Sequence, residues 1–257
     1  MLNQQVLTLY QRGKYKEAIP IAEKLLEIRK KERGLQDADA ASCLDDLGAL
    51  YEEMGDYPKA EPLYQQALQI RQKVLGPEHP DTALSFNNLA VLYAHTGNYA
   101  KAEPLYQQAI DIRKKSLGEN HPLTAASINS LGVLYYRMGD YTRAEPFFQE
   151  ALQIRQKVLG PEHPDTASGL NDLAGMYVDA GDYAKAEPLL RQTLGIRKKA
   201  LGPEHPETAA SLSNLAFLYE AMGDHSRAEP LYQQALQIRK LFESRKRLSA
   251  RNTQASL

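Results

Sequence analysis

Four histidines recur at equivalent places in the sequence, and histidine is the side chain that most readily binds metals or transfers protons near neutral pH. His79, His121, His163 and His205 are spaced 42 residues apart, and a proline follows each of them. A metal ion holds its nitrogen ligands about 2 Å away, whereas equivalent atoms of stacked helical hairpins lie roughly two helix diameters of ~10 Å apart. We therefore predict a repeated structural contact, such as a helix cap, and no metal site.

The sequence motifs of common catalytic and cofactor sites are missing. There is no G-x-S-x-G, no H-E-x-x-H, no P-loop and no dinucleotide-binding glycine fingerprint. Each serine, histidine and aspartate that lies near another such residue occupies a place that the repeat explains. The sequence therefore predicts a protein with no catalytic residues, no enzyme activity and no cofactor.

Composition and charge argue against several other classes of function. The 31 basic and 32 acidic residues give a formal charge of -1, so we expect no general attraction to nucleic acid or to anionic membranes. The sequence has no run of ~18 apolar residues that would span a bilayer, and its start lacks the features of a signal peptide. Cys43 is the single cysteine and falls at a small position of a predicted helix, which indicates a buried, inert thiol. These features favour a cytoplasmic protein.

The histidine spacing reflects a 42-residue period that runs through the chain. It is marked by glycines at Gly13, Gly55, Gly97, Gly139, Gly181 and Gly223, each followed two places later by a tyrosine or, in the last case, by His225. A fixed period of this length is typical of solenoids, in which each unit buries its apolar face against its neighbours. We predict an all-α, right-handed solenoid of six repeats over residues 1–33, 34–75, 76–117, 118–159, 160–201 and 202–243. The first is incomplete or capping, and residues 244–257 are expected to form a basic, disordered tail.

Each repeat is predicted to be a helical hairpin, which the third repeat illustrates best. One helical stripe over residues 80–95 consists of Phe86, Leu89, Ala90 and Tyr93. Pro80 suits the first position of that helix, and Gly97 suits its end because glycine adopts the left-handed conformation. Asn98 is then expected to cap a second helix that ends near Leu117.

The first helix also carries a motif that resembles a known family. Phe86-x-x-Leu89-Ala90-x-x-Tyr93 is similar to the W-x-x-L-G-x-x-Y signature of the tetratricopeptide repeat, and Ala102 follows in the second helix. The long period and the segments FNNLAVLY and AEPLYQQALQIR resemble the repeats of kinesin light chain and nephrocystin-3. This resemblance implies a non-catalytic interaction scaffold whose first helices line a concave surface.

Residues at offsets +1, +2, +5, +8 and +9 from the signature residue share one face of the first helix. The candidate groove residues at these offsets are Asn87, Asn88, Val91, His95, Asn129, Val133, Tyr136, Arg137, Asn171, Asn214 and Phe217, together with Asp45 and Asp46 in the second repeat. An asparagine amide both donates and accepts hydrogen bonds, so a column of them suits the backbone of an extended peptide. In the alternative interpretation, these amides bond to neighbouring helices or to water.

Recurring arginines and the acidic second repeat suggest further contacts. The arginines Arg29, Arg71, Arg113, Arg155, Arg197 and Arg239 lie late in the second helices. We expect ion pairs between repeats with carboxylates such as Glu61 or Glu103, and contact with an acidic ligand is the alternative. Asp45 and Asp46 favour a ligand with a basic segment at that end.

The function predicted from these features is the binding of a protein or peptide ligand in the groove. The alternative is an assembly or oligomerisation module that acts through its end repeats, since Leu241 and Phe242 would leave apolar groups exposed there. Weak self-association would follow from that alternative. RNA binding requires a basic inner face, which Asp45 and Asp46 contradict, so neither nucleic acid nor membrane is expected as a partner.

Overall fold

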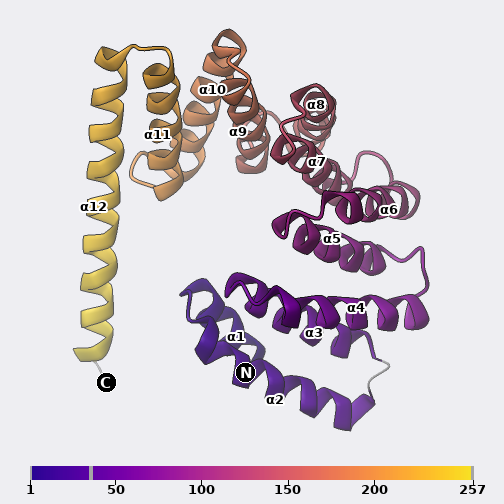
Figure 1. The fold of residues 1–257 in the computed structure, drawn as a ribbon. Coiled ribbons are helices and arrows are strands. Elements are labelled where there is room, and N and C mark those ends of the chain that lie inside the picture. Colours follow the sequence, from indigo (N-terminus) through magenta and orange to yellow (C-terminus); the bar gives the residue numbers. More distant parts are fainter. Residues whose placement is uncertain (1, 35–36, 256–257) are drawn as a thin grey trace. The chain divides into compact units, whose positions relative to one another are not determined.

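The computed structural model describes residues 2–34 and 37–255, which form twelve α-helices and no strand (Figure 1). In chain order the helices are α1 (Leu2–Gln11), α2 (Tyr15–Arg33), α3 (Ala38–Glu53), α4 (Tyr57–Val74), α5 (Pro80–His95), α6 (Tyr99–Leu117), α7 (Pro122–Arg137), α8 (Tyr141–Leu159), α9 (Pro164–Asp179), α10 (Tyr183–Leu201), α11 (Pro206–Ala221) and α12 (His225–Ala255). Each odd-numbered helix is the first helix of a repeat, and the helix after it is the second.

The chain divides into two compact units, Met1–Met138 and Gly139–Leu257, which are described separately. In the first unit α3 packs on α4 and α5 on α6, while α2, α4 and α6 each contact the first helix of the next repeat. The second unit follows the same scheme, with α9 on α10, α11 on α12, and contacts of α8 with α9 and of α10 with α11. The all-α solenoid of helical hairpins predicted from the period is therefore confirmed.

The recurring histidines cap the first helices, as the sequence predicts. The Nδ1 atom of His79 accepts a hydrogen bond from the backbone N–H of Asp81 at 3.1 Å. His121, His163 and His205 make the same contact at 3.1–3.2 Å. The described residues contain no group of three or more His, Cys, Asp or Glu side chains that would hold a metal ion.

The cap predicted for Asn98 is wrong. Its side chain makes no capping hydrogen bond, although Asp140 and Asp182 at the equivalent positions have nearly the same backbone angles and do accept one. The N–H of Asn98 instead donates to the carbonyl of Tyr93 at 2.8 Å and closes the turn after α5. Gly97 has φ +74° there, so the left-handed conformation predicted for the turn glycine is confirmed.

We expect Gly97→Val to lower the free energy of unfolding by about 1–3 kcal/mol, since a β-branched residue is strained at positive φ. Urea denaturation measures this loss. The matched control is Gly175→Ala in α9, where a new Cβ would meet no atom within 4 Å and φ is not positive. That change is expected to stabilise the protein by roughly 0.5–1 kcal/mol. Equal effects of the two substitutions would contradict the argument.

A tyrosine and a glutamate join consecutive repeats, and we call this pair the Tyr–Glu contact. The tyrosine hydroxyl of a first helix donates to a glutamate of the preceding second helix at 2.5–2.7 Å in four pairs, Tyr93–Glu61, Tyr135–Glu103, Tyr177–Glu145 and Tyr219–Glu187. A cation of the same repeat also covers the ring in several cases, as Lys101 does over Tyr93 at 4.8 Å. These tyrosines therefore pack between repeats.

The recurring arginines also join consecutive repeats, but not to the carboxylates predicted for them. Guanidinium groups donate to a serine of the next first helix at 2.5–3.0 Å in Arg71–Ser85, Arg113–Ser127 and Arg197–Ser211, the Arg–Ser contact. Ion pairs between repeats do occur as predicted, in Arg29–Asp39 at 3.6 Å and Arg197–Glu207 at 3.4 Å. Glu61 and Glu103, the examples given for the carboxylate partners, were wrong, and both accept hydrogen bonds from tyrosines. Arg71 also forms a buried ion pair with Asp45 in its own repeat.

Helix α12 differs from the predicted C-terminal tail. It continues past Glu243 to Ala255, where the composition had predicted disorder. Residues 244–255 include three arginines and two alanines, which are good helix formers, and Arg245 forms an ion pair with Glu204 at 2.6 Å. Residues 256 and 257 of the predicted tail lie outside the described residues.

The remaining local predictions concern the thiol and the membrane. Cys43 is buried, and its burial raises the pKa of the thiol, as expected for an inert cysteine. Within residues 2–34 and 37–255, none of the helices combines the length and the apolar character needed to cross a membrane.

Candidate functional site

In the first unit, the inner faces of α5 and α7 enclose a pocket of about 110 Å³. Its lining consists of Val91, Ala94 and His95 from α5, Tyr106 from α6, and Ser130, Val133, Leu134 and Arg137 from α7. Four of these residues, Val91, His95, Val133 and Arg137, are among the predicted groove residues. The helical offsets therefore identified side chains from two repeats that the structure brings together around one cavity.

The pocket combines an apolar interior with polar groups at its edge. Val91 and Val133 are half-buried, whereas Arg137 is exposed and forms no ion pair within the part of the chain that the structure describes. Burial raises the pKa of the Tyr106 phenol well above its ordinary value, and the positive charge of Arg137 opposes that shift only in part. The phenol therefore stays neutral beside a cation that is available to a ligand.

His95 is held at the edge of the pocket by the preceding repeat. Its Nδ1 atom lies 2.7 Å from a carboxylate oxygen of Glu52 in α3, and the imidazole N–H donates this bond. The other oxygen of Glu52 accepts a hydrogen bond from Tyr64 at 2.8 Å. Because Glu52 is bound from two sides, it positions the imidazole and is itself not free for a ligand.

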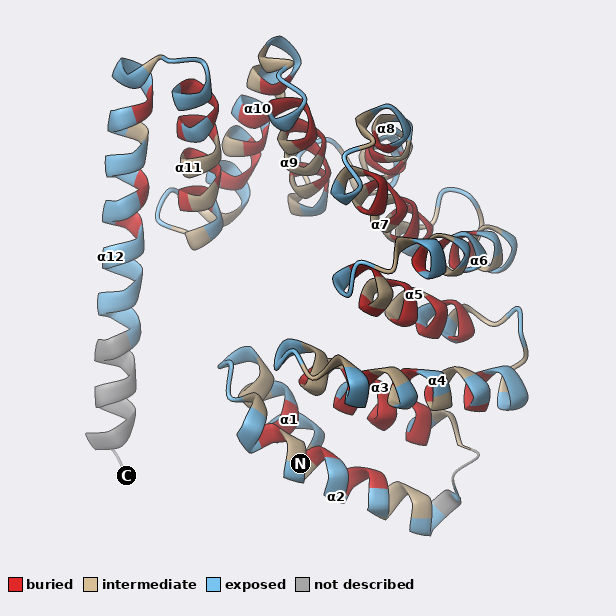
Figure 2. Ribbon diagram, viewed as in Figure 1, coloured by how far each residue is buried: buried red, intermediate tan, exposed pale blue. Residues whose placement is uncertain are grey.

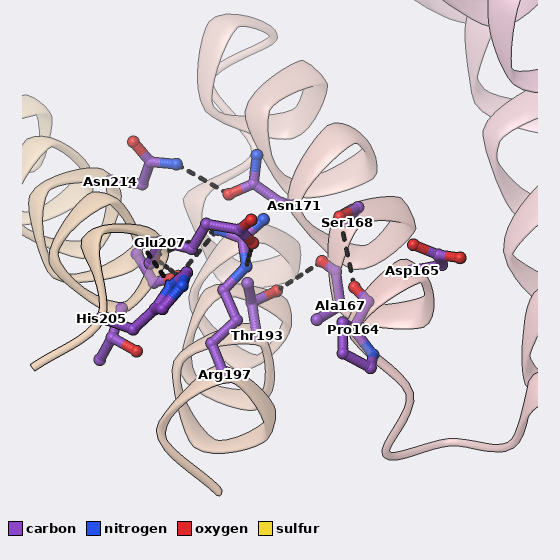
Figure 3. A network of polar contacts seen from close by, with 12 residues as sticks. Pro164, Asp165, Ala167, Ser168, Asn171, Thr193, Arg197, His205, Glu207 and Asn214 are labelled. Atoms are coloured by element: carbon purple, nitrogen blue, oxygen red, sulfur yellow. Dashed lines mark hydrogen bonds and ion pairs between the residues drawn. The ribbon is translucent and has the colours of Figure 1, made fainter. Parts of the chain in front are cut away.

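Several predicted groove amides interact between repeats. In the second unit, Asn214 of α11 donates to Asn171 of α9 at 2.7 Å (Figure 3). In the first unit, Asn88 of α5 lies next to Asp45 of α3 and helps to lower the pKa of that carboxyl against the opposing effect of burial. At these positions the structure favours the alternative interpretation of the asparagine column, in which the amides bond to neighbouring helices.

The other predicted positions are more varied. Asn129 and Tyr136 are half-buried on α7, and the side-chain oxygen of Asn87 is buried with no hydrogen-bond partner among the residues that the structure describes. In the second unit Phe217 is 52% exposed on α11. Asp46 is exposed on α3, but Asp45 is buried against Arg71 and does not face solvent. The expected acidic end of the groove therefore retains Asp46 and loses Asp45.

Tyr106 and Leu134 are the pocket residues that the helical offsets did not suggest, since the offsets considered first helices alone and Leu134 lies at offset +6. An aromatic residue recurs at the place of Tyr106 in several second helices, as Tyr64, Phe148 and Tyr232. That recurrence was the available signal, but it indicates a packing position and does not show that the ring of Tyr106 also lines a cavity.

Comparison with protein family models finds one family over nearly the whole chain. The tetratricopeptide repeat model matches residues 1–73, 47–115, 81–154, 124–199 and 170–240. The chain belongs to the tetratricopeptide repeat family. Tetratricopeptide repeat arrays are general scaffolds for protein–protein interaction, and solenoids of this kind offer extended binding surfaces.

Solved structures support the same family. BtubC (BKLC) from P. vanneervenii is 26% identical, with a TM-score of 0.72 over 94% of this chain and 92% of that one. The structure of the nearly identical TPR-like repeats of a kinesin light chain protein from Podosopora anserina is also similar. Its sequence is 30% identical to this chain, with a TM-score of 0.67 over 79% of this chain and 96% of that one. The predicted resemblance to kinesin light chain repeats is confirmed.

A more distant neighbour shares the fold alone. A Rap protein complexed with competence and sporulation factor is 15% identical, with a TM-score of 0.64 over 93% of this tetratricopeptide repeat chain and 74% of that one. A search of curated protein sequences gave no match.

Proposed function

We propose that the inner face of α5 and α7 binds an extended peptide segment of a partner protein, with one apolar side chain of that segment in the pocket. The pocket carries the proposal. A volume of about 110 Å³ equals the space of roughly three to four water molecules at ~30 Å³ each, which suits an aliphatic side chain. Val91 and Val133 supply apolar contacts, and Arg137 supplies a hydrogen-bond donor and a positive charge at the rim.

The chemistry of the ligand follows from the partners that remain available. Glu52 is occupied by His95 and Tyr64, and Asp45 is occupied by Arg71. A basic ligand segment would therefore find Asp46 alone among these carboxylates, while Arg137 favours a carbonyl or carboxylate beside the apolar side chain. We accordingly propose an aliphatic residue with an acceptor group next to it, in place of the basic segment expected from sequence.

We expect Val133→Trp to fill the pocket and to weaken peptide binding about ten-fold or more, because a blocked pocket excludes the anchoring side chain. The probes are peptides selected from a random 12-residue library against the unmodified full chain, with affinities measured by fluorescence anisotropy. The free energy of unfolding should change by less than about 1 kcal/mol, since Val133 is only half-buried.

The matched control is Gln108→Trp, which adds the same ring to an exposed position of α6. This variant should bind the selected peptides like the unmodified chain. The proposal is wrong if Val133→Trp leaves their affinity unchanged, or if the library yields no peptide that binds.

A second candidate function is assembly through the C-terminal repeat, and exposed apolar side chains on α12 favour it. The exposed fractions are 52% for Leu236, 40% for Leu241 and 41% for Phe242. An exposed apolar face on an end repeat is typical of a docking surface. Measurement of the molecular mass against protein concentration tests whether the face joins copies of the chain.

A further inference from the structure

The outer face of α12 carries the residue types that other second helices bury beneath the next repeat. The position of Tyr232 is filled by Tyr64, Tyr106, Phe148 and Leu190 in the preceding repeats, where the exposed fractions are 1–4%. Tyr232 itself is 36% exposed, and Leu236 is 52% exposed where Ile110 and Leu152 are buried. Figure 2 shows the buried residues of α12 on the side that faces α11 and exposed residues over the rest of its described surface. The apolar half of an inter-repeat interface is therefore present without its other half.

The polar half of the same interface is also present. Glu229 occupies the place of Glu61, Glu103, Glu145 and Glu187, which accept the tyrosine hydroxyl of the next repeat. In α12 Glu229 accepts a hydrogen bond from Gln233 at 3.0 Å, as Glu61 does from Gln65, but no tyrosine among the described residues reaches it. Arg239 occupies the place of Arg71 and donates to Ser213 of its own repeat at 3.1 Å.

The internal interfaces show what completes such a face. In three interfaces the first helix that packs there carries a serine and a tyrosine eight residues apart, Ser85–Tyr93, Ser127–Tyr135 and Ser211–Tyr219, whereas α3 and α9 have Cys43 and Gly169 at the serine position. Eight residues of helix span ~12 Å, and the two hydroxyls reach the arginine and the glutamate at opposite ends of the second helix. The tyrosine meets the early glutamate and the serine meets the late arginine. The two helices are therefore antiparallel.

We propose that the outer face of α12 binds an amphipathic helix of a partner protein that carries a serine and, eight residues later, a tyrosine, with a leucine four residues after the serine. The helix lies antiparallel to α12, with its tyrosine at Glu229, its serine at Arg239, and its leucine toward Leu236. The leucine is present in the internal examples as Leu89 and Leu131. The partner is thus defined by the chemistry of the three internal interfaces that have both the Arg–Ser and the Tyr–Glu contact.

A second copy of the chain fits this face poorly. Its α1 carries Leu9 at the place of the tyrosine, so Glu229 would lose solvent without gaining a hydroxyl donor. An unsatisfied buried acceptor costs about 1–3 kcal/mol. The first helices that do carry the serine and tyrosine pair are already packed within their own units, as α5 is on α4 and α6.

The test uses the full chain and a synthetic peptide with the sequence of residues 80–95, labelled with a fluorophore and held helical by a side-chain cross-link between positions 84 and 88. The cross-link is needed because isolated helices of this length are marginal in water. We expect saturable binding in fluorescence anisotropy, and we expect Leu236→Glu to weaken it about ten-fold or more, because a charge would then be buried in the contact. Gln234→Glu, on another exposed position of α12, is the matched control and should leave binding unchanged.

A double-mutant cycle separates the proposed contact from general hydrophobic attachment. A peptide with Tyr93→Phe should bind the unmodified chain several-fold more weakly than the original peptide does. On the Glu229→Gln chain, the two peptides should bind with nearly equal affinity. Val133→Trp should have no effect on this peptide, so the result is independent of the pocket between α5 and α7.

Three results would overturn the inference. The first is no binding of the helical peptide, and the second is binding that Leu236→Glu leaves unchanged. The third is a molecular mass that rises with concentration in the unmodified chain and not in Leu236→Glu, which would assign the face to a second copy.

Discussion

Replacing Arg71 by methionine is expected to lower the free energy of unfolding by about 3–5 kcal/mol, because the change leaves a buried carboxylate without its counter-charge. Arg71 is 3% exposed and Asp45 is 8% exposed. The substitution also removes the donor to Ser85 in the next repeat, which lies 2.5 Å from the guanidinium. Urea denaturation of the full chain at pH 7 measures the loss.

The loss should depend on pH in a defined direction. Burial raises the pKa of Asp45 above its ordinary value, and Arg71 opposes that shift, so Arg71→Met raises the pKa further. A carboxyl whose pKa is higher in the folded state destabilises the fold as pH rises from the unfolded value near ~4 through the folded value. The difference between the unmodified chain and the variant should therefore grow between about pH 4 and pH 7.

The control for this prediction removes both charges. Asp45→Leu combined with Arg71→Met should lose less stability than Arg71→Met alone, since no uncompensated charge stays buried. The pH dependence attributed to Asp45 should also vanish. Equal losses in the single and double variants, both independent of pH, would show that Arg71 acts by packing and not by its charge.

Phe148→Ala is expected to cost about 3–5 kcal/mol, the usual range for removing a buried aromatic side chain. Phe148 is 1% exposed in α8, whereas Tyr232 fills the equivalent position of α12 and is 36% exposed. Tyr232→Ala should therefore cost less than about 1.5 kcal/mol, although it removes a hydrogen bond to Glu220. Chemical denaturation of both variants measures the contrast, and similar losses would mean that the outer face of α12 is covered in solution.

Local features of the fold were readable from sequence because each depends on residues close together in the chain. The bounds of α5 and α6 match the predicted hairpin, since Pro80 begins one helix and Gly97 takes positive φ at its end. The histidine caps follow from the same local chemistry. Asn98 shows the limit, because its residue type suits a cap but its side chain makes no capping hydrogen bond, whereas Asp140 and Asp182 at equivalent positions do.

Contacts between repeats were less predictable, because each polar group has several suitable partners at repeat spacing. Glu61 was predicted to form an ion pair with an arginine of another repeat, and the structure pairs it with the hydroxyl of Tyr93. Residue type alone does not determine whether a glutamate forms a salt bridge with an arginine or a hydrogen bond with a tyrosine hydroxyl. The groove prediction shares this problem. The offsets included Val91 and Val133, which line one pocket, but could not separate an amide available to a ligand from one that bonds to the preceding repeat, as Asn214 does.

The regular Tyr–Glu and Arg–Ser contacts also bear on how such a gene can change length. Removal of residues 160–201, one complete period, would join α8 to α11 through an equivalent linker. Glu145 would then meet Tyr219, and Arg155 would meet Ser211, so the new junction would reuse the pairing of the old ones. Recombination between similar coding segments can thus add or delete whole repeats without a new interface having to evolve. Asp45 sets the second repeat apart, because the equivalent residues of the later repeats are Asn87, Asn129, Asn171 and Ser213, and a loss of that repeat would remove a buried ion pair that no other repeat can restore.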